Sequence, residues 1–518
     1  MASTSTTQAS SGPGTQEHDK AQKENSSNLG IDVEKSGAVS FEPDLKPPFS
    51  IFSDTKKKLI VLTISFIGLL SPLSANIYFP AINAIAKDLN VSNSDINLTV
   101  TTYLIFQAIG PTFFGNLADV KGRRLAYIMC LTISVAANIA LACQRNYAAL
   151  LVLRCVQSSG SAATVALGQA VVADVSTRAE RGKWVAYASM GIMLGPAIGP
   201  LVGGLLDTYM GWPAIFWFLA IFAGVMLMVT LTYLPETCRT VVGNGSVPPQ
   251  KWNRTLWSFL RKKEVGEQTE TLQRAKKRPN PFSSILIILK KEDGLILLYG
   301  AFLYAGFYVV LITLTDQLAA RYGFNTLQIG LCYIPFGVGC MASRFSVGIF
   351  LDRNYKRLAQ KLDPSTPQNT TQDPENFPIE KARLQIGIPA AYASALSIII
   401  YGWVMHFHTS LAGPLIMLFL IGNFTTGAFN VSSTLIVDIN MHQPATASAA
   451  NNLARCGMGA VFTAFAQPLV GAIGIGWTST AVAGLWVVLS PCLWAVMVWG
   501  PKWRAEEKGK MEEKEEKK

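Results

Sequence analysis

Twelve long apolar runs are the feature that most constrains what this chain can fold into. A transmembrane helix needs about 20 mostly apolar residues, and the runs of that length are 59–82, 97–118, 125–143, 148–172, 184–206, 212–234, 294–318, 327–350, 385–405, 411–437, 445–472 and 478–500. Half of the residues (50%) are hydrophobic and only 15% are charged, too few to cover the surfaces of several soluble domains. The sequence therefore predicts an all-α membrane protein with twelve transmembrane helices.

The runs form two sets of six, separated by a polar stretch with basic clusters. The second and eighth runs both end in Gly-x-x-x-Asp, at Gly115–Asp119 and Gly348–Asp352, which predicts two pseudo-symmetric six-helix halves. The expected parts are a disordered cytosolic N-terminal tail (1–55), a first bundle (56–237), a cytosolic linker (238–291), a second bundle (292–503) with a cytosolic insert (353–384), and a charged C-terminal tail (504–518).

Lysine and arginine residues gather in the loops on one side of the predicted membrane. Because such residues favour cytosolic loops, the bias predicts that both termini lie in the cytosol. Loop charge also accounts for the net charge of +11 without a nucleic-acid partner, since no basic face with recurring aromatic residues is present. The sequon Asn90-Val91-Ser92 then falls in an outside loop, where Asn90 is a candidate glycosylation site.

The loop between the second and third runs reads Gly115-Asn-Leu-Ala-Asp119-Val-Lys-Gly122-Arg123-Arg124. Gly122 permits a sharp turn, and Arg123 and Arg124 are expected at the inner headgroups. Asp119, at a helix end, could bind the positive N-terminus of a neighbouring helix and hold a cytosolic gate in one state. The alternative is that Asp119 only caps a turn and the arginines only set the topology.

Glycines recur at every fourth position of the fifth run, at Gly191, Gly195, Gly199 and Gly203. They lie along one helix face, and such a ridge, free of side chains, lets another helix approach closely. Pro196 and Pro200 weaken the backbone hydrogen bonding between them and permit a kink. Ordinary packing of small residues is the alternative interpretation.

Polar side chains inside the runs are candidates for a substrate or proton pathway. Arg154 and Gln157 share a helix face in the fourth run, and Arg154 should face the bundle interior because an arginine in lipid costs ~2.5 kcal/mol or more. Arg344, in the eighth run, lies near enough to the inner headgroups to reach them. The other candidates are Asn76, Tyr78, Gln107, Asn430, Asn451, Asn452 and Arg455. For each of them, hydrogen bonding between helices is the alternative role, and Arg154 could simply bond to helix carbonyls.

Few carboxylates accompany these arginines. Asp174, Asp316 and Asp438 lie near the ends of runs, and the first run contains no acid. The imbalance predicts an electropositive cavity suited to anions or neutral molecules, and it leaves the proton carrier unidentified.

With these motifs in place, the chain resembles the major facilitator superfamily over about residues 56–503. The loop at Gly115 is close to that family's signature G-x-L-a-D-r-x-G-r-r, with Val120 where arginine is frequent. The pair Arg154 and Gln157 is similar to the family's fourth-span element R-x-x-q-x-x-G, which is implicated in proton or substrate handling.

Two further stretches narrow the resemblance. The glycine ridge looks like the antiporter signature of the twelve-span drug:proton exporters. Residues 74–80 and 451–456 are similar to segments of fungal multidrug and quinidine-resistance exporters, a group that also includes citrate exporters. What the resemblance implies is the major facilitator fold, export rather than uptake, and coupling to protons. The absent first-span acid departs from many exporters of cations.

The function expected is proton-coupled efflux of drugs, toxins or secondary metabolites by alternating access, with export of a carboxylic acid such as citrate as the alternative. An enzyme is not expected, because the motifs H-E-x-x-H, G-x-x-x-x-G-K-[ST] and G-x-S-x-G are lacking. A non-transporting sensor stays open as a further class. No cofactor or metal is expected, and the eight cysteines contain no C-x-x-C pair. We expect a monomer, in the plasma membrane rather than a vacuolar or endosomal one.

Overall fold

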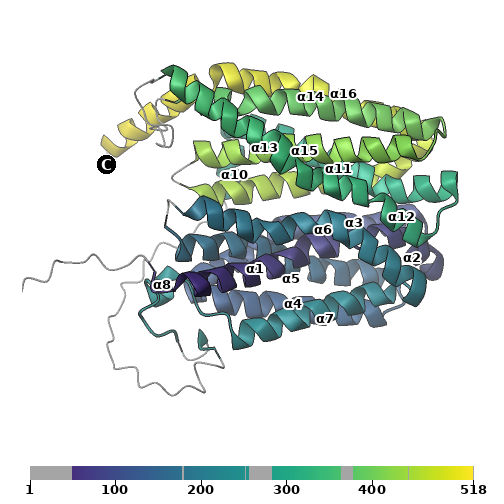
Figure 1. Cartoon of the computed structure of the whole chain (residues 1–518), viewed down its shortest axis with the longest axis horizontal. Helices are drawn as coiled ribbons and strands as arrows, with labels where there is room; N and C mark the ends of the chain where they lie inside the picture. The colour runs from purple at the N-terminus through teal and green to yellow at the C-terminus, as the bar shows by residue number, and fades with distance from the viewer. Residues whose placement is uncertain are drawn as a thin grey trace, which may run out of the picture. The chain divides into compact units, whose positions relative to one another are not determined.

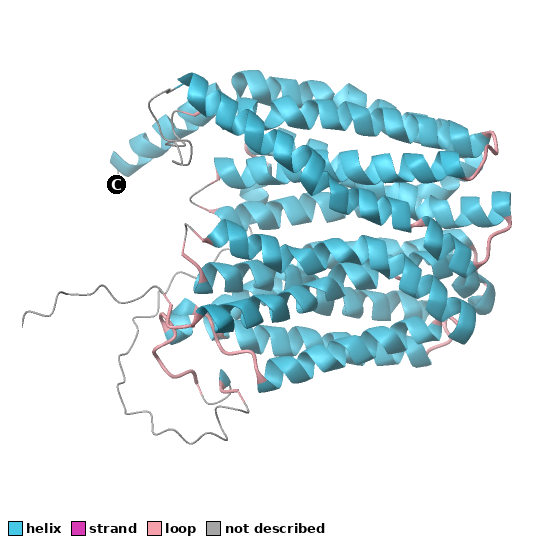
Figure 2. Cartoon of the chain, in the orientation of Figure 1, coloured by secondary structure: helices cyan, strands magenta, loops and turns pink. Residues whose placement is uncertain are grey.

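The computed structural model describes residues 50–177, 180–250, 253–255, 283–362, 377–440 and 443–516. Within these ranges every regular element is a helix, and no strand occurs (Figure 2). The predicted N-terminal tail up to residue 49, the basic clusters of the linker and the middle of the predicted insert (363–376) lie outside the described residues.

The first half of the chain begins with a broken helix. Helix α1 ends at Asn76, where the run 59–82 predicted one continuous helix, and a 3-10 turn η1 and the short helix α2 follow it. Pro80 lies inside η1 and has no backbone N–H to continue the helical bonding, which accounts for the break. The elements of this half are α1 (Asp54–Asn76), η1 (Phe79–Ala81), α2 (Ile82–Leu89), α3 (Asn93–Lys121), α4 (Arg123–Cys143), α5 (Tyr147–Val175), α6 (Arg181–Met210), α7 (Pro213–Thr232) and α8 (Arg239–Val242).

The second half contains α10 (Ser283–Ile288), α11 (Lys291–Tyr322), α12 (Thr326–Cys332), α13 (Ile334–Leu362), α14 (Ile379–His406), α15 (Ala412–Ile439) and α16 (Pro444–Glu516). Helix α16 is two helices joined at Gly474, whose φ of 78° and ψ of 164° are not helical. Helix α13 runs to Leu362, into the stretch predicted as a polar insert from residue 353. Its last turns are stabilised by Tyr355, whose ring lies 4.7 Å from that of Phe377.

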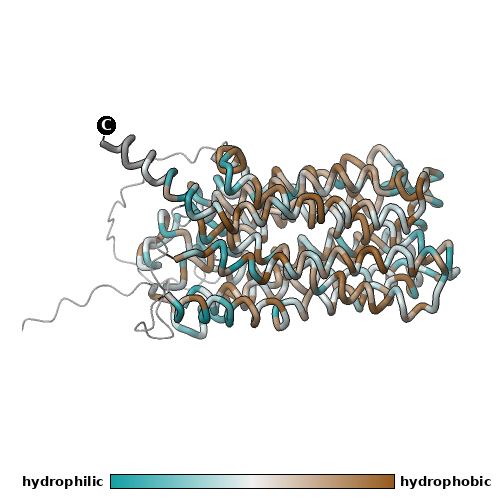
Figure 3. The backbone as a smooth tube through the Cα atoms, turned by 90° about the horizontal axis from the view of Figure 1, so that it is seen from above, coloured by the Kyte–Doolittle hydropathy of each residue, from teal (hydrophilic) through white to brown (hydrophobic). Residues whose placement is uncertain are grey.

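Ten candidate membrane spans are found among the described residues. The predicted count of twelve is not confirmed by them and stays a prediction. Two helices account for the difference. Helix α3 is 29 residues long but carries many polar residues and is not among the ten. The two parts of α16 fall within one candidate, Thr446–Glu506. Figure 3 shows hydrophobic residues along the middle of the helices and hydrophilic ones toward both ends.

Successive long helices run in opposite directions, so the loops gather at two ends. We call the end that holds residues 90–92, 144–146, 211–212 and 323–325 the Asn90 end, and the opposite one, with Gly122 and residues 233–238 and 440, the Arg123 end. In Figure 1 the helices of the first half (purple to teal) lie side by side as one group and those of the second half (green to yellow) as another. The two groups meet where α3 contacts α16 and where α6 contacts α12 and α13.

Candidate functional site

The glycine ridge of α6 lies directly against α1. A Cβ atom added at Gly195 would lie 2.6 Å from Pro72 Cβ, and one at Gly199 would lie 3.1 Å from Asn76 Cβ. Added at Gly191 or Gly203, it would overlap a backbone carbonyl of α1, that of Ser65 or of Ile77 respectively. At Gly191, Gly195 and Gly203 even a methyl group would force α1 and α6 apart, and at Gly199 it would make a tight contact. Pro196 and Pro200 both lie within the continuous helix α6.

The opposite face of α6 packs on the second half of the chain. A Cβ atom at Gly204 would lie 2.7 Å from the Thr326 carbonyl oxygen, and one at Gly330 would lie 2.7 Å from the Pro200 carbonyl oxygen. Gly337 of α13 contacts the backbone of Ala197. Helix α6 therefore lies between α1 and the α12–α13 pair. Sequence analysis did not identify Gly330 and Gly337, although their seven-residue spacing marks one helix face.

At the Arg123 end, the two arginines of the predicted gate loop bind acceptors of the protein itself. Arg123 forms an ion pair with Asp119, and its Nε donates to Asp174 Oδ2 at 3.0 Å. Arg124 is 2% exposed, and its Nη2 donates to the Leu231 carbonyl at 2.8 Å. Protein acceptors therefore bind part of each guanidinium group, and contact with the inner headgroups stays a prediction.

The N-terminus of α4 binds a carboxylate, but it is that of Glu236 and not of Asp119. The backbone N–H groups of Arg123 and Arg124 donate to Glu236 Oε1 and Oε2 at 2.8 and 3.1 Å. Gly122 has φ of 112°, and a Cβ there would overlap the Glu236 carboxylate. The carboxylate thus neutralises the positive end of the helix dipole and requires glycine at the turn.

The beginning of the linker folds back onto the end of α3. Thr240 Oγ1 donates to the Asp119 carbonyl at 2.9 Å, and the fully buried Asn253 donates from Nδ2 to the Lys121 carbonyl at 2.9 Å. These contacts satisfy carbonyl groups that the end of a helix leaves without partners. Sequence analysis missed Glu236, Thr240 and Asn253.

Arg154 is fully buried between two tyrosine rings. Its Cζ lies 4.3 Å from the ring centroids of both Tyr78 and Tyr103. Its Nη1 donates to Gln157 Oε1 at 2.7 Å and to the Ser74 carbonyl at 3.3 Å. Ser74 lies in the last turn of α1, so Arg154 supplies a donor and a positive charge at that helix end. The predicted pair of Arg154 and Gln157 does meet in the structure.

One edge of the Arg154 guanidinium group is left without a partner. Nε and Nη2, which form that edge, have no hydrogen-bond partner in the described part of the chain. Gln157 Nε2 donates onward to Asn138 Oδ1 at 2.7 Å, and the Tyr78 hydroxyl bonds to Thr99 Oγ1 at 3.0 Å. The surrounding polar groups are therefore mostly satisfied, whereas the arginine keeps two free donors on one side.

The second predicted arginine, Arg455 of α16, has a similar aromatic setting. Its Cζ lies 5.0 Å from the Tyr304 ring centroid and 5.8 Å from that of Phe429, and its Nη2 donates to Asn452 Oδ1 at 2.9 Å. Asn452 Nδ2 in turn donates to the Gln107 carbonyl at 3.0 Å, which joins α16 to α3.

The two arginines come from opposite halves and share one neighbour. Tyr308 lies within electrostatic range of both Arg154 and Arg455. Neither guanidinium forms an ion pair with a carboxylate within the ranges that the structure describes. Among the described residues, each half thus contributes one arginine that lies beside aromatic rings and has no carboxylate partner; we call Arg154, Arg455 and these rings the two-arginine site.

The other predicted residues lie around this site or away from it. Gln107 Nε2 donates to Ser71 Oγ at 3.3 Å, Asn76 Nδ2 to the Pro72 carbonyl at 2.6 Å, and Asn451 Nδ2 to Ser433 Oγ at 3.0 Å. Asn430 and Arg344 are exposed, and neither is brought into the arginine cluster by a hydrogen bond. Asn90 is exposed in a left-handed conformation (φ 53°) at the end of α2, and Gly115 has open space around its Cα.

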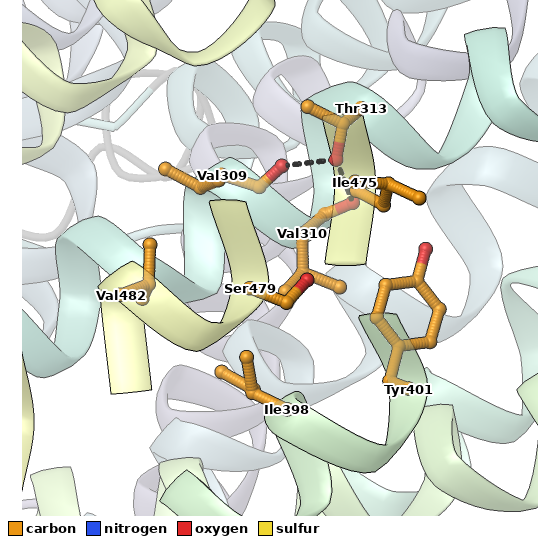
Figure 4. Close-up of a pocket in the computed structure, with 8 residues that line it drawn as sticks. All are labelled: Val309, Val310, Thr313, Ile398, Tyr401, Ile475, Ser479 and Val482. Atoms are coloured by element: carbon orange, nitrogen blue, oxygen red, sulfur yellow. Dashed lines mark hydrogen bonds between the residues drawn. The ribbon is translucent and has the colours of Figure 1, made fainter. Parts of the chain in front are cut away.

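A small pocket lies elsewhere, inside the second half. Its lining comes from α11, α14 and α16, namely Val309, Val310, Thr313, Ile398, Tyr401, Ile475, Ser479 and Val482 (Figure 4). Thr313 Oγ1 is already bonded to the Val309 carbonyl at 2.7 Å. With one half alone contributing and mostly apolar walls, this pocket is a packing void of that half, separate from the two-arginine site.

Comparisons with known proteins agree on one family. The family model described as Major Facilitator Superfamily matches residues 64–464. The MFS-type transporter R5 of Phoma sp. is 44% identical over 461 residues, which cover 89% of this chain and 88% of that protein. Citrate exporter 1 of Aspergillus niger is 34% identical over 484 residues, 90% of this chain and 92% of that protein.

Solved structures show the same fold at low sequence identity. The xylose transporter XylE of E. coli, in a partially occluded inward-open conformation, matches with a TM-score of 0.60 and 14% identity, covering 85% of this chain and 97% of its own. The human organic anion transporter MFSD10 matches with a TM-score of 0.53 and 19% identity. The match covers 84% of this chain and 99% of the MFSD10 chain. With its helices, its signature loop and these relatives, the chain belongs to the Major Facilitator Superfamily, whose members are membrane transport proteins rather than enzymes.

Proposed function

We propose that this transporter is a proton-coupled exporter that moves small organic molecules by alternating access. The observation that carries the proposal is the two-arginine site, to which each half contributes one guanidinium group and neither contributes a paired carboxylate. A buried cation without a counterion is costly, so binding of an anionic group from the substrate would relieve that cost. Substrates that carry a carboxylate or a similar anionic group on an apolar body fit the arginines and the surrounding tyrosine rings.

The leading substrate class is drugs, toxins or secondary metabolites of this chemistry. A small carboxylic acid such as citrate is the second candidate, and two observations favour it: the pair of arginines, and 34% identity to a citrate exporter. The resemblance of the Gly191–Gly203 ridge to an antiporter signature supports export and proton coupling in both cases.

The contacts between the halves support alternating access. At the Asn90 end, Thr315 Oγ1 donates to the Phe79 carbonyl at 2.9 Å, and Gly204 meets Gly330. At the Arg123 end, the ion pair Arg383–Asp438 joins two helices of one half. A carrier joined at one end and built from two halves can expose its central site to the other side.

We also propose the membrane arrangement expected from the loop charges. Both termini and the Arg123 end face the cytosol, the Asn90 end faces the exterior, and the protein is a plasma-membrane monomer with a glycan at Asn90. In this orientation an exporter would load the two-arginine site from the cytosol, through the Arg123 end.

The test is transport by purified protein in liposomes with an imposed proton gradient. Radiolabelled citrate and a panel of aromatic carboxylic acids are offered on the side of the Arg123 end, and accumulation on the other side is followed with and without a protonophore. Gradient-driven flux supports the proposal, whereas its absence for the whole panel argues against it. In cells, acid export without altered drug tolerance would select the carboxylic-acid function.

A further inference from the structure

We propose that Asp316 is a proton-binding residue at the Asn90 end, and that its protonation holds the two halves closed there. The inference rests on the alternating access proposed above. Asp316 belongs to α11 in the second half, and its Oδ1 accepts a hydrogen bond of 2.8 Å from Asn93 Nδ2, on the first residue of α3 in the first half. The neighbouring residue Thr315 bonds to the Phe79 carbonyl, so two consecutive residues of α11 join the halves.

The surroundings of this carboxyl group are polar but uncharged. Asp316 is 9% exposed. Asn93 also donates to Asn83 Oδ1 at 2.9 Å, and the side chains of Asn83 and of Gln467 on α16 face the same carboxyl group. Tyr333, between α12 and α13, is a further titratable group near Asp316, and its hydroxyl bonds to Thr315 and to the Leu311 carbonyl.

Most charged groups on the adjacent elements have other partners, and Lys87 of α2 is exposed. Asp95 of α3 accepts from Ser92, Asp88 of α2 binds Arg145 and Trp212, and Arg321 of α11 donates to Gln317 and to the carbonyls of Met405 and His406. No cation in the described ranges pairs with Asp316, so its ionised form has no counterion.

Two oxygen atoms at this contact need a donor. Asp316 Oδ2 and Gln467 Oε1 are both buried and form no short hydrogen bond among the described residues, although the amide groups of Asn83 and Gln467 lie close enough to the carboxyl group to favour its ionised form in part. A proton on Oδ2 turns the carboxylate into a carboxylic acid, removes the uncompensated charge and supplies an O–H group that can donate to Gln467 Oε1. When the Asn90 ends separate, water solvates the carboxyl group and the proton can leave. Protonation and closure of this end therefore favour each other.

The experiment measures the separation of the halves directly, without a substrate. Spin labels are placed at Lys87→Cys on α2 and Ser410→Cys, both exposed sites at the Asn90 end, in full-length protein carrying Cys143→Ser, because Cys143 is itself exposed. Distance distributions are recorded in lipid nanodiscs between about pH 5 and pH 8. One coupled proton changes the ratio of closed to open molecules by at most ~tenfold per pH unit.

In the otherwise native protein we expect the closed population to fall as the pH rises. Asp316→Asn, which has the shape of the protonated acid, should stay closed with a ratio independent of pH. Asn93→Asp places a second carboxyl group at the contact and should open this end near neutral pH, with closure at lower pH. Asp88→Asn removes a carboxylate at the same end, outside the contact, and should retain the native pH response.

The proposal is overturned if the native distances do not respond to pH, or if Asp316→Asn retains the native response. Proton-driven flux is measured on the same preparations. A pH-dependent distance with no flux for any acid of the panel would contradict the proposed function and leave the role of Asp316 standing, so the two failures are distinguishable.

Discussion

Arg154 combines two roles in one side chain. One guanidinium nitrogen completes the end of α1 through the Ser74 carbonyl, while Nε and Nη2 remain free between the rings of Tyr78 and Tyr103. The flat group fits between two rings because both of its faces stack on aromatic systems, and its edge alone is left for a ligand. A structural role and a substrate role are therefore compatible at this residue.

We predict that Arg154→Lys lowers transport by more than ~tenfold, while the protein stays folded. The ammonium group can still reach a helix carbonyl, but it is a point charge without a planar edge and cannot stack between two rings. Initial rates in proteoliposomes and thermal unfolding in detergent provide the two measurements. Arg344→Lys, at an exposed position of α13, is the matched control and should transport normally. If Arg154→Lys transported at the native rate, the free edge formed by Arg154 Nε and Nη2 would have no role in transport.

At Glu236 we predict a loss of stability. Glu236→Gln removes the charge that caps the first turn of α4 and should lower the free energy of unfolding by about 1–2 kcal/mol. Asp119→Asn breaks an ion pair in which the Asp119 side chain is 52% exposed, so its effect should stay below about 1 kcal/mol. Denaturant unfolding in detergent ranks the two variants. The reverse ranking would mean that Asp119, and not Glu236, anchors this loop.

Helix α6 is packed so closely on two faces that larger side chains do not fit there. Its glycines contact α1 on one face, and Gly204 and Ala197 contact α12 and α13 on the other. Helices pack this closely only where small residues let their backbones touch, and a larger side chain would push the helices apart.

A single methyl group on this ridge should be sufficient to disturb the packing. Gly203→Ala would overlap the Ile77 carbonyl and is expected to destabilise the fold by about 1–3 kcal/mol. Gly224→Ala in α7 is the matched control, since no atom lies within 4 Å of its added Cβ and a helical alanine is favoured over glycine. Melting temperatures of both variants are compared with the native value. If Gly203→Ala melted at the same temperature as the native protein, α1 and α6 could move apart without a loss of stability.

Sequence alone predicted the helical class from the lengths of the apolar runs, the glycine ridge from spacing within one helix, and the family from the resemblance of its motifs. It also paired Arg154 with Gln157, which are one helical turn apart. It missed Glu236 at the N-terminus of α4 and Asn93 opposite Asp316, because the partners lie more than 100 residues apart and meet only after the helices pack. The break after Asn76 was missed as well, since the apolar run continues through it.

For the whole molecule, the interface between the halves at the Asn90 end sets which side is open. It is built from small residues such as Gly204, Gly330 and Gly337, and from the hydrogen bonds of Thr315 and Asp316. Phe79 of the first half also packs against Tyr308 and Tyr333 of the second, with ring centroids 6.1 and 6.4 Å apart, so these rings must part when the surfaces separate.

We therefore predict that Gly337→Val opens the Asn90 end. Its side chain would overlap the backbone of Ala197 in the other half, and the ratio of closed to open molecules should fall at least ~tenfold. Gly348→Val lies on the same helix with open space around it and should leave the ratio unchanged. Labels at residues 87 and 410 report the separation. If the Gly337→Val variant remained closed, the contact between Gly337 and Ala197 would not belong to the interface that opens.

The double contact of α6 has a consequence for how such a carrier can change its cargo over evolutionary time. A helix that packs closely through glycine and alanine on two faces cannot acquire large recognition groups there without displacing its neighbours. Changes in substrate selectivity should then arise at the aromatic and arginine positions of α3, α5, α11 and α16. The packing faces of α6 should keep their small residues.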